Sequence, residues 1–290
     1  MNADLEKASE IAKKVIPFAK SIVKKDKPLL EIAEEIESKI IELGAKPAFP
    51  TNLSIDEIAA HDTPAYNDER KAYGLLKVDL GVKVNKKIID YAFSVDLTEE
   101  KKYKKLIETS EKALQNALES IKNNSSFGEV GKSIQKTAEE NSLSPIINLS
   151  GHEIDDESLH AGLIIPNYDN KNSSKIPDGI FAIEPFITAG VGKIYDGRPS
   201  GIYILEAPAQ PRDKKAREVL DFIIKEYSTF PFCSRWIVKK FSSSALISLK
   251  QLEQSGIIHN YAQLIEKSQS PVAQFETTIL KENNKVFVLA

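Results

Sequence analysis

The sequence has very few of the side chains that bind soft metals. It holds a single cysteine, Cys233, and only four histidines among 290 residues. One thiol cannot form an internal disulfide, and it excludes a zinc site built from several cysteines. Asp and Glu, in contrast, number 42. Any metal site in this chain would therefore depend mainly on carboxylates.

Long hydrophobic runs and a strong charge of one sign are also missing. No stretch approaches the roughly 18 apolar residues of a membrane-spanning helix, and the first residues hold no apolar signal-peptide core. The net charge of −3 gives no general attraction to nucleic acid or to anionic membranes. Hydrophobic residues at 41% and charged residues at 28% are typical of a globular chain. We therefore expect a cytoplasmic globular protein.

The spacing of apolar residues predicts a mixture of helices and strands. Three- and four-residue spacing predicts helices over about 5–22 and 29–43, and Pro17 is expected to kink the first helix or end it early. Alternation predicts strands over 76–82 and 88–95, joined by a turn at 85–87. Helices are expected next at about 103–121 and 127–138, a further helical stretch at 211–255, and closing strands at 272–280 and 286–289.

The late helical stretch is locally basic and permits two interpretations. Residues 212–258 include nine Lys or Arg and five Asp or Glu. A basic helical module could bind nucleic acid, or the charges could form the solvated face of a packed helical insert. We favour the insert.

Four carboxylates lie within apolar, strand-like segments: Asp79, Asp90, Glu184 and Glu276. Burying an unpaired carboxylate is costly, and a hairpin tends to bring Asp79 and Asp90 opposite each other, where like charges repel. Any one of them could instead face solvent or pair with a lysine. The shared setting of all four favours a divalent metal site. Four carboxylates exceed what one ion needs, so two bridged ions fit better.

One imidazole is expected to complete this site. His152 is our candidate, because Gly151 beside it lets the backbone approach closely. His160 and His61 also lie among loop and strand-like segments, whereas we assign no role to His259. Oxygen ligands with one imidazole suit Mn, Fe, Co or Zn better than a thiolate-loving metal.

The order and flanks of these residues resemble a known family. The matching segments are 77–81 (KVDLG), Asp90 eleven residues after Asp79, 150–152 (SGH), 159–162 (LHAG), 182–186 (AIEPF) and 273–276 (AQFE). They resemble the methionine aminopeptidases, whose dinuclear metal set has the order Asp, Asp, His, Glu, Glu. The resemblance extends from about residue 46 to the C-terminus. A helical insertion before the last ligand is typical of type 2 enzymes, and the sequence of residues 183–186 resembles the archaeal form.

The resemblance implies both a fold and an activity. The fold is α/β (α+β), the pita-bread fold, with two pseudo-symmetric halves around a curved antiparallel sheet. Its catalytic domain would cover 1–192 and 259–290, with an inserted helical subdomain over 193–258. The activity is removal of the initiator methionine from nascent proteins with a small second residue. A hydroxide held by two divalent ions (Co, Mn, Fe or Zn) would attack the scissile carbonyl.

The resemblance also implies partners. N-terminal methionyl peptides and nascent chains would be substrates, and contact with the ribosome is left open. Membranes and specific nucleic acids are not expected, and a monomer is.

Roles for individual residues follow from the same resemblance. Asp79 would chelate one ion, Asp90 and Glu276 would bridge both, and His152 and Glu184 would bind the other. Glu184 would also act as general acid and base. His160 and His61 would donate hydrogen bonds to the scissile peptide and the oxyanion. The methionine side chain would occupy an apolar pocket lined by Phe49, Leu159, Phe186 and Leu264, with Tyr261 beside it.

Three positions depart from the family pattern. Thr277 stands where the family often has His, and Asp62 stands where it often has Tyr, in the segment 61–64 (HDTP). Tyr91 replaces a small hydroxyl residue. None is a ligand, so we expect differences only near Glu276, at the cleft rim, and in a hydrogen bond to a metal carboxylate.

Two other functions compete with this one. A proline-directed aminopeptidase or dipeptidase could use the same fold, but such chains usually carry a larger separate N-terminal domain than the roughly 45 helical residues expected here. A non-catalytic relative that binds nucleic acid or the ribosome would have lost metal ligands, and none is lost in this sequence.

Overall fold

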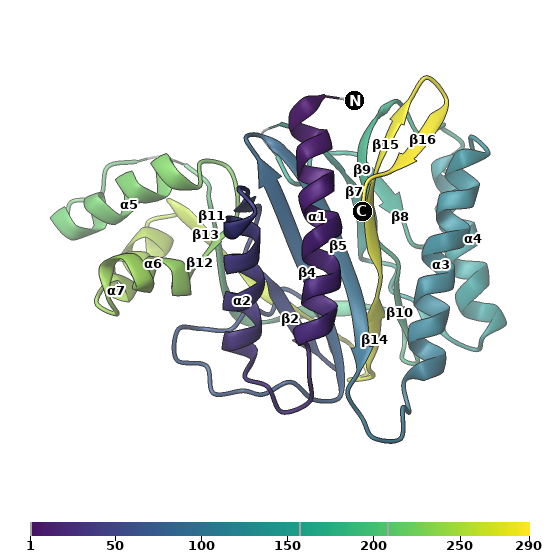
Figure 1. Ribbon diagram of the computed structural model, residues 1–290, viewed down its shortest axis with the longest axis horizontal. Helices are drawn as coiled ribbons and strands as arrows, with labels where there is room; N and C mark the ends of the chain where they lie inside the picture. Colours follow the sequence, from purple (N-terminus) through teal and green to yellow (C-terminus); the bar gives the residue numbers. More distant parts are fainter. Residues whose placement is uncertain (1, 157, 208) are drawn as a thin grey trace.

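The computed structural model describes residues 2–156, 158–207 and 209–290. Within these residues, one large antiparallel sheet forms the centre of the molecule (Figure 1). Its strands run in the order β1 (Lys46–Pro47), β4 (Leu75–Val84), β5 (Lys87–Asp96), β15 (Glu276–Glu282), β9 (Gly179–Ile183), β7 (Ser150–Ile154) and β8 (Ile164–Pro166). Two more strands pair on its flanks: β2 (Asn52–Ile55) with β4, and β16 (Lys285–Val288) with β15.

The hairpin of β4 and β5 confirms the two strands expected at 76–82 and 88–95. Both strands are longer than predicted, because ten residues of each pair without interruption. The turn is made at Asn85, whose φ of 53° is a conformation that Asn tolerates well. The strands are buried along almost their whole length, since a helix covers one face and the candidate site occupies the other.

Two pairs of helices cover the sheet. Helices α1 (Ala3–Ile22) and α2 (Leu29–Glu42) pack together, and α1 contacts β4 and β5. Helices α3 (Lys104–Lys122) and α4 (Phe127–Glu140) also pack together, against strands of the other half. Figure 1 shows the two pairs of helices on either side of the chain segment that contains β14 and β15. The four helices confirm the predicted ones, and their buried faces belong to one continuous hydrophobic core.

Of the two effects expected of Pro17, an early end of the first helix is wrong, because α1 continues to Ile22. The expected kink stays a prediction. Proline removes one backbone hydrogen bond inside a helix. Residues on both sides of it, Val15, Ile16 and Ala19, are buried against the core. Burial of this apolar face compensates for the missing bond and keeps the last turn helical.

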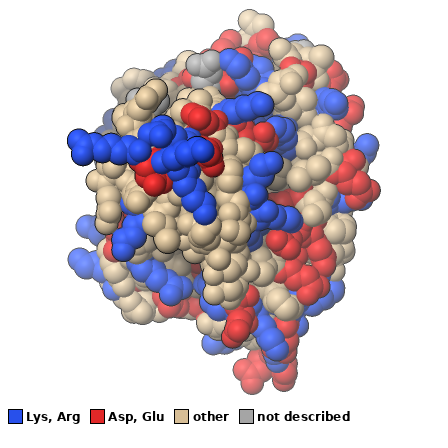
Figure 2. Space-filling model, turned by 90° about the vertical axis from the view of Figure 1, so that its left-hand side faces the viewer, with Lys and Arg blue, Asp and Glu red and all other residues tan. Residues whose placement is uncertain are grey.

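The stretch predicted as helical over 211–255 contains α5 (Lys214–Glu226), α6 (Ser234–Phe241) and α7 (Ala245–Gln254), which confirms its helical character. These helices enclose a core of their own, which includes Val219, Leu220, Ile223, Ile237 and Leu249. On the face that they present, Lys and Arg side chains alternate with Asp and Glu (Figure 2). Ion pairs connect some of these charges to the rest of the molecule, such as Lys46 with Glu226 and Lys239 with Glu34.

Two long strands flank these helices and were not predicted. Strand β11 (Ile194–Leu205) pairs with β13 (Ile258–Glu266), in a sheet with the order β12 (Phe232–Cys233), β11, β13, β3 (Ile58–Ala60). The sequence of β11 hides its strand character, because it includes Gly197, Pro199 and Gly201 and its register shifts twice. The division into 1–192 with 259–290 and an insert over 193–258 therefore stays a prediction, and the insert begins with a strand.

A third, short sheet consists of β14 (Val272–Gln274), β10 (Phe186–Thr188) and β6 (Ser144–Pro145). Among the described residues, no helix has the length and apolar character needed to cross a membrane.

Candidate metal centre and cleft

The register of the large sheet places two rows of functional side chains on one face. In the first row, Asp79 on β4 pairs with Ala92 on β5, and Ala92 pairs with Glu276 on β15. Glu184 follows directly after β9, whose last residue, Ile183, pairs with Thr277. The small side chain of Ala92 leaves open space between the two carboxylates. Three acids from distant parts of the sequence therefore meet across four adjacent strands, β4, β5, β15 and β9.

The second row lies two residues further along the strands, and therefore on the same face. Asp90 on β5 pairs with Gly81 on β4. The hydroxyl of Thr278 on β15 donates to the backbone oxygen of Asp90 at 2.9 Å and accepts from its backbone nitrogen at 2.7 Å. His152 on β7 pairs with Ala182 on β9. The expected opposition of Asp79 and Asp90 is thus a diagonal one, with the two residues in neighbouring rows.

The five predicted ligands converge into two overlapping groups. Asp90, His152 and Glu276 place potential ligand atoms within 4.8 Å of one another, and so do Asp79, Glu184 and Glu276. Glu276 belongs to both groups, as a bridging carboxylate would. The Nε2 atom of His152 lies 3.6 Å from Oδ2 of Asp90. This arrangement has the form of two adjacent cation sites.

Unsatisfied polar atoms indicate that the site fits divalent cations. Buried side-chain atoms nearly always have a hydrogen-bond partner. Oδ1 of Asp79, Oδ1 of Asp90, Nδ1 of His152 and both carboxylate oxygens of Glu276 are buried without a partner among the residues that the structure describes. Carboxylate oxygens with one imidazole are suitable ligands for Mn, Fe, Co or Zn. A pair of cations would supply both the missing contacts and the missing positive charge.

The pKa values of the acids lead to the same conclusion. Burial raises the pKa of Asp79 to about 7, and burial together with the charge of neighbouring carboxylates raises the pKa of Asp90, Glu184 and Glu276 well above the usual value. Burial also lowers the pKa of His152 to about 3, which keeps its imidazole neutral and able to bind a metal. Nearby cations favour ionised carboxylates, so they would lower the raised pKa values of these acids again.

A cleft of about 330 Å³ opens onto this cluster. Asp79, Asp90, His152 and Glu184 line its base, while Glu276, 1% exposed, lies beneath them. Every residue predicted to bind substrate also lines the cleft: Phe49, His61, Leu159, His160, Phe186, Tyr261 and Leu264. The structure therefore brings all the predicted site residues together.

His61 presents a hydrogen-bond acceptor to the cleft. Its Nδ1 atom lies 3.2 Å from the carbonyl oxygen of Ala262, which can only accept, so Nδ1 carries the proton of this hydrogen bond. Burial lowers the pKa of His61 to about 4, which keeps the ring neutral near pH 7. Nε2 is then unprotonated. This tautomer differs from the expectation that His61 donates a hydrogen bond to substrate.

His160 packs against His152 through its ring. The ring centroids of His160 and His152 lie 4.4 Å apart in an edge-to-face arrangement. His160 also lies on the wall of the cleft.

Sequence reasoning missed several residues around the site. Nε2 of Gln274 donates to Oε1 of Glu184 at 2.8 Å, and Thr278 holds the backbone of Asp90 as described above. Thr278 stands two residues after Glu276 on β15, so its position on the same strand face was a usable signal. Gln274 ends β14, a strand of another sheet, and no local pattern indicates its contact with Glu184. Ile202 and Pro231, from the segment predicted as an insert, also line the cleft. Their contribution depends on the path of β11, which the sequence does not reveal.

The expected effect of Tyr91 on a metal carboxylate is wrong. Tyr91 precedes Ala92 and follows Asp90, so its side chain points to the opposite face of the sheet. There its hydroxyl accepts a hydrogen bond from Nζ of Lys20 on α1 at 3.2 Å. Thr277, the residue on β15 that pairs with Tyr91, donates from its hydroxyl to the backbone oxygen of Ala290. Both departures therefore concern the packing behind the sheet.

Comparisons with known proteins agree with this geometry. Residues 3–220 match the model of metallopeptidase family M24. A methionine aminopeptidase of Pyrococcus abyssi is 41% identical over 289 residues, covering 98% of this chain and 97% of the relative. One of Methanocaldococcus jannaschii is 41% identical over 282 residues, covering 96% and 95%.

Solved structures share the fold at lower sequence identity. A thermophilic Arx1 has a TM-score of 0.83 with 15% identity, covering 99% of this chain and 90% of that one. A methionine aminopeptidase from Rickettsia prowazekii has a TM-score of 0.67 with 19% identity, covering 98% and 94%. The predicted pita-bread fold is confirmed. The chain belongs to metallopeptidase family M24, among its methionine aminopeptidases.

Proposed function

We propose that this protein removes the N-terminal methionine from peptides and nascent proteins, with Asp79, Asp90, His152, Glu184 and Glu276 holding two divalent cations. One observation carries the proposal: ligand atoms of Asp79, Asp90 and Glu276 are buried at the base of an apolar cleft without a hydrogen-bond partner among the described residues, and they lie close to His152 and Glu184. Asp79 would hold one cation, Asp90 and Glu276 would be shared by both, and His152 with Glu184 would hold the other. A ligand atom of Glu184 lies within 4.8 Å of those of Asp79 and Glu276, so Glu184 would stand close to both cations. Two bound cations lower the pKa of water and polarise a scissile carbonyl.

The protein's own side chains then position the substrate and move the proton. Glu184 takes a proton and returns it to the departing amine, while Gln274 fixes its Oε1 atom by a 2.8 Å hydrogen bond. His160 donates a hydrogen bond to the carbonyl oxygen as charge develops. His61, with Nε2 unprotonated, accepts one from a substrate N–H group. Phe49, Leu159, Phe186, Leu264 and Tyr261 enclose the unbranched methionine side chain.

We also propose the finer setting of this reaction. The catalytic domain covers 1–192 and 259–290, and the insert over 193–258 is supported by the separate core that its helices enclose. Ile202 and Pro231 from this insert add to the cleft wall. The substrates are nascent chains in the cytoplasm whose second residue is small, and the ribosome is a candidate partner that purification from lysate would test.

A peptide assay after metal exchange tests the proposed reaction. The protein is stripped with a chelator, reloaded with Co, Mn, Fe or Zn, and given Met-Ala-Ser. Methionine release that disappears on chelation and returns with one of these metals is expected. Absence of release with all four would contradict the proposal.

Two further measurements separate the competing functions. Faster cleavage of Xaa-Pro substrates than of Met-Ala-Ser would identify a proline-directed enzyme instead. A non-catalytic relative would bind fewer than two metal ions per chain and release nothing.

A further inference from the structure

The backbone at His61 is held in a strained conformation. Its φ is 59°, in the left-handed region that non-glycine residues seldom adopt. Such residues persist only where the surrounding structure fixes them. The conformation turns the chain out of β3 and places the imidazole on the wall of the cleft. The contacts that maintain this turn therefore determine where the imidazole lies.

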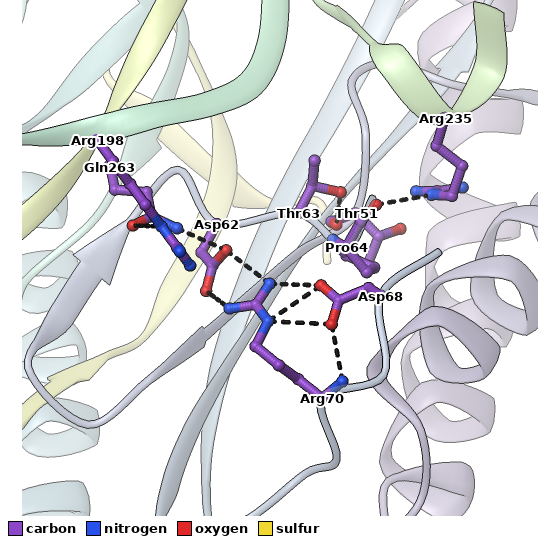
Figure 3. A network of polar contacts seen from close by, with 9 residues as sticks. All are labelled: Thr51, Asp62, Thr63, Pro64, Asp68, Arg70, Arg198, Arg235 and Gln263. Carbon is purple, nitrogen blue, oxygen red and sulfur yellow. Dashed lines mark hydrogen bonds and ion pairs between the residues drawn. The ribbon is translucent and has the colours of Figure 1, made fainter. Parts of the chain in front are cut away.

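The next residue, Asp62, is the centre of these contacts (Figure 3). It is 1% exposed, and both of its carboxylate oxygens accept hydrogen bonds from Arg70, at 2.7 Å and 3.0 Å. Nε2 of Gln263 donates to Oδ1 of Asp62 at 2.8 Å. Arg70 is itself held by Asp68, to which it donates from Nε and from one terminal nitrogen. We call Asp62, Arg70, Asp68 and Gln263 the Asp62 network.

Two further contacts hold the segment that follows Asp62. The hydroxyl of Thr63 donates to the backbone oxygen of Thr51 at 2.8 Å. Nε of Arg235, on α6 of the proposed insert, donates to the backbone oxygen of Pro64 at 3.1 Å. Three successive residues are therefore attached to three different parts of the chain, as Figure 3 shows.

The Asp62 network acts at the position adjacent to the imidazole contact. Asp62 is bonded to Gln263, and His61 is bonded to Ala262, so two neighbouring residues on one segment meet two neighbouring residues on β13. Nε of Arg198 donates to the side-chain oxygen of Gln263 at 3.0 Å, which turns the NH₂ group of Gln263 toward Asp62. A displacement of Asp62 would therefore move the 3.2 Å contact that fixes the tautomer of His61.

Asp62, at the centre of the Asp62 network, is one of the departures from the family pattern described above. A tyrosine at this position could not accept the paired hydrogen bonds of a guanidinium group. The contact between Arg70 and residue 62 therefore depends on the aspartate that this chain has there.

We propose that Arg70 is a positioning residue that acts through Asp62 and Gln263 to hold His61 in the cleft with Nε2 unprotonated. The inference builds on the proposed function, because Arg70 would affect the substrate only through the proposed contact of His61 with it. Its first consequence is kinetic. Arg70→Met in the metal-loaded enzyme lowers kcat/KM for Met-Ala-Ser about tenfold, because a misplaced imidazole no longer meets the substrate N–H group.

A double-mutant cycle tests whether Arg70 acts through His61. In the His61→Ala background, Arg70→Met is expected to change kcat/KM less than twofold, because the residue that it positions is already gone. Gln263→Leu provides a second variant should Arg70→Met fold poorly, and the same pattern is expected of it. Equal losses in both backgrounds would overturn the proposal. Lys27→Met, which removes ion pairs with Glu31 and Glu35 at the start of α2, is the matched control and leaves kcat/KM unchanged.

Nitrogen-15 NMR of the histidine side chains gives a readout that does not depend on activity. The chain has four histidines, and His61→Ala assigns the signal of the missing one. The native signal is expected to show a protonated Nδ1 and an unprotonated Nε2, and Arg70→Met is expected to average the two tautomers. An unchanged signal in Arg70→Met would contradict the positioning role. Failure of the native enzyme to release methionine would instead contradict the proposed function and leave this test valid.

Discussion

At the scale of single residues, the decisive property of the site is that its acids lie close together, two of them buried and two half-buried. Among the described residues they form no ion pair with Lys or Arg. The four carboxylates could be recognised from the sequence, since each stands in an apolar, strand-like segment where an unpaired charge is costly. Their supporting hydrogen bonds could not. The bond from Gln274 to Glu184 depends on how β14 meets the end of β9, which no local pattern encodes.

Removing the shared ligand is expected to remove one cation. Glu276→Gln replaces the carboxylate that belongs to both groups of ligand atoms, so we expect about one metal ion per chain and at least a 100-fold lower kcat. Elemental analysis and the peptide assay measure the two effects. Glu282→Gln, at the exposed end of the same strand, is the control. Two ions per chain and full activity in Glu276→Gln would show that Glu276 is not a ligand.

The role of Gln274 predicts a different pattern. Gln274→Leu removes the donor to Oε1 of Glu184 but no ligand atom, so the metal content is expected to stay unchanged while kcat falls about tenfold. Gln274→Glu is expected to be worse, because it adds a negative charge to the carboxylate cluster. Parallel losses of metal and of activity in Gln274→Leu would make Gln274 necessary for metal binding instead.

At the scale of secondary structure, helices and strands with regular apolar spacing could be predicted from the sequence, and irregular strands could not. The helices α1 to α4 and the hairpin of β4 and β5 follow repeating apolar patterns, so the sequence predicted them. Burial of α1 against the core outweighed the effect of Pro17, and the polar, glycine- and proline-bearing sequence of β11 concealed a strand that is defined by its partner β13.

The close approach of the loop before β2 to β4 predicts a sensitive position. A Cβ atom on Gly81 would lie 2.4 Å from the ring of Phe49 and 2.8 Å from Cβ of Ala48. Gly81→Ala is therefore expected to lower the free energy of unfolding by about 1–3 kcal/mol and to raise KM, since Phe49 lines the cleft. Urea denaturation and the peptide assay measure both. Gly179→Ala, whose Cβ would lie 3.2 Å from Phe181, is the milder comparison. Equal stability of the two variants would refute the packing argument.

At the scale of the whole molecule, one buried ion pair joins the helices of the proposed insert to the rest of the chain. Arg235 on α6 donates two hydrogen bonds to Glu37 on α2, at 2.7 Å and 2.8 Å, and the indole of Trp236 donates a third. Arg235 and Glu37 are 2% and 6% exposed. The sequence could not predict this contact, because its two partners lie almost 200 residues apart.

Breaking this pair on one side is expected to be strongly destabilising. Arg235→Met leaves Glu37 buried without its main partner, which costs about 3–5 kcal/mol. The double variant Arg235→Met with Glu37→Met should recover part of this loss, because no unpaired charge remains. Urea denaturation of both variants checks the expectation. A double variant no more stable than Arg235→Met would contradict it.

The central claim is that five residues from five separate parts of the chain surround a pair of divalent cations. Anomalous scattering from a crystal of the metal-loaded protein tests it most directly. We predict two peaks on the face shared by β4, β5, β15 and β7, both beside Glu276, with Asp79 at one and His152 at the other. A single peak elsewhere on the molecule, or none among these residues, would contradict the account.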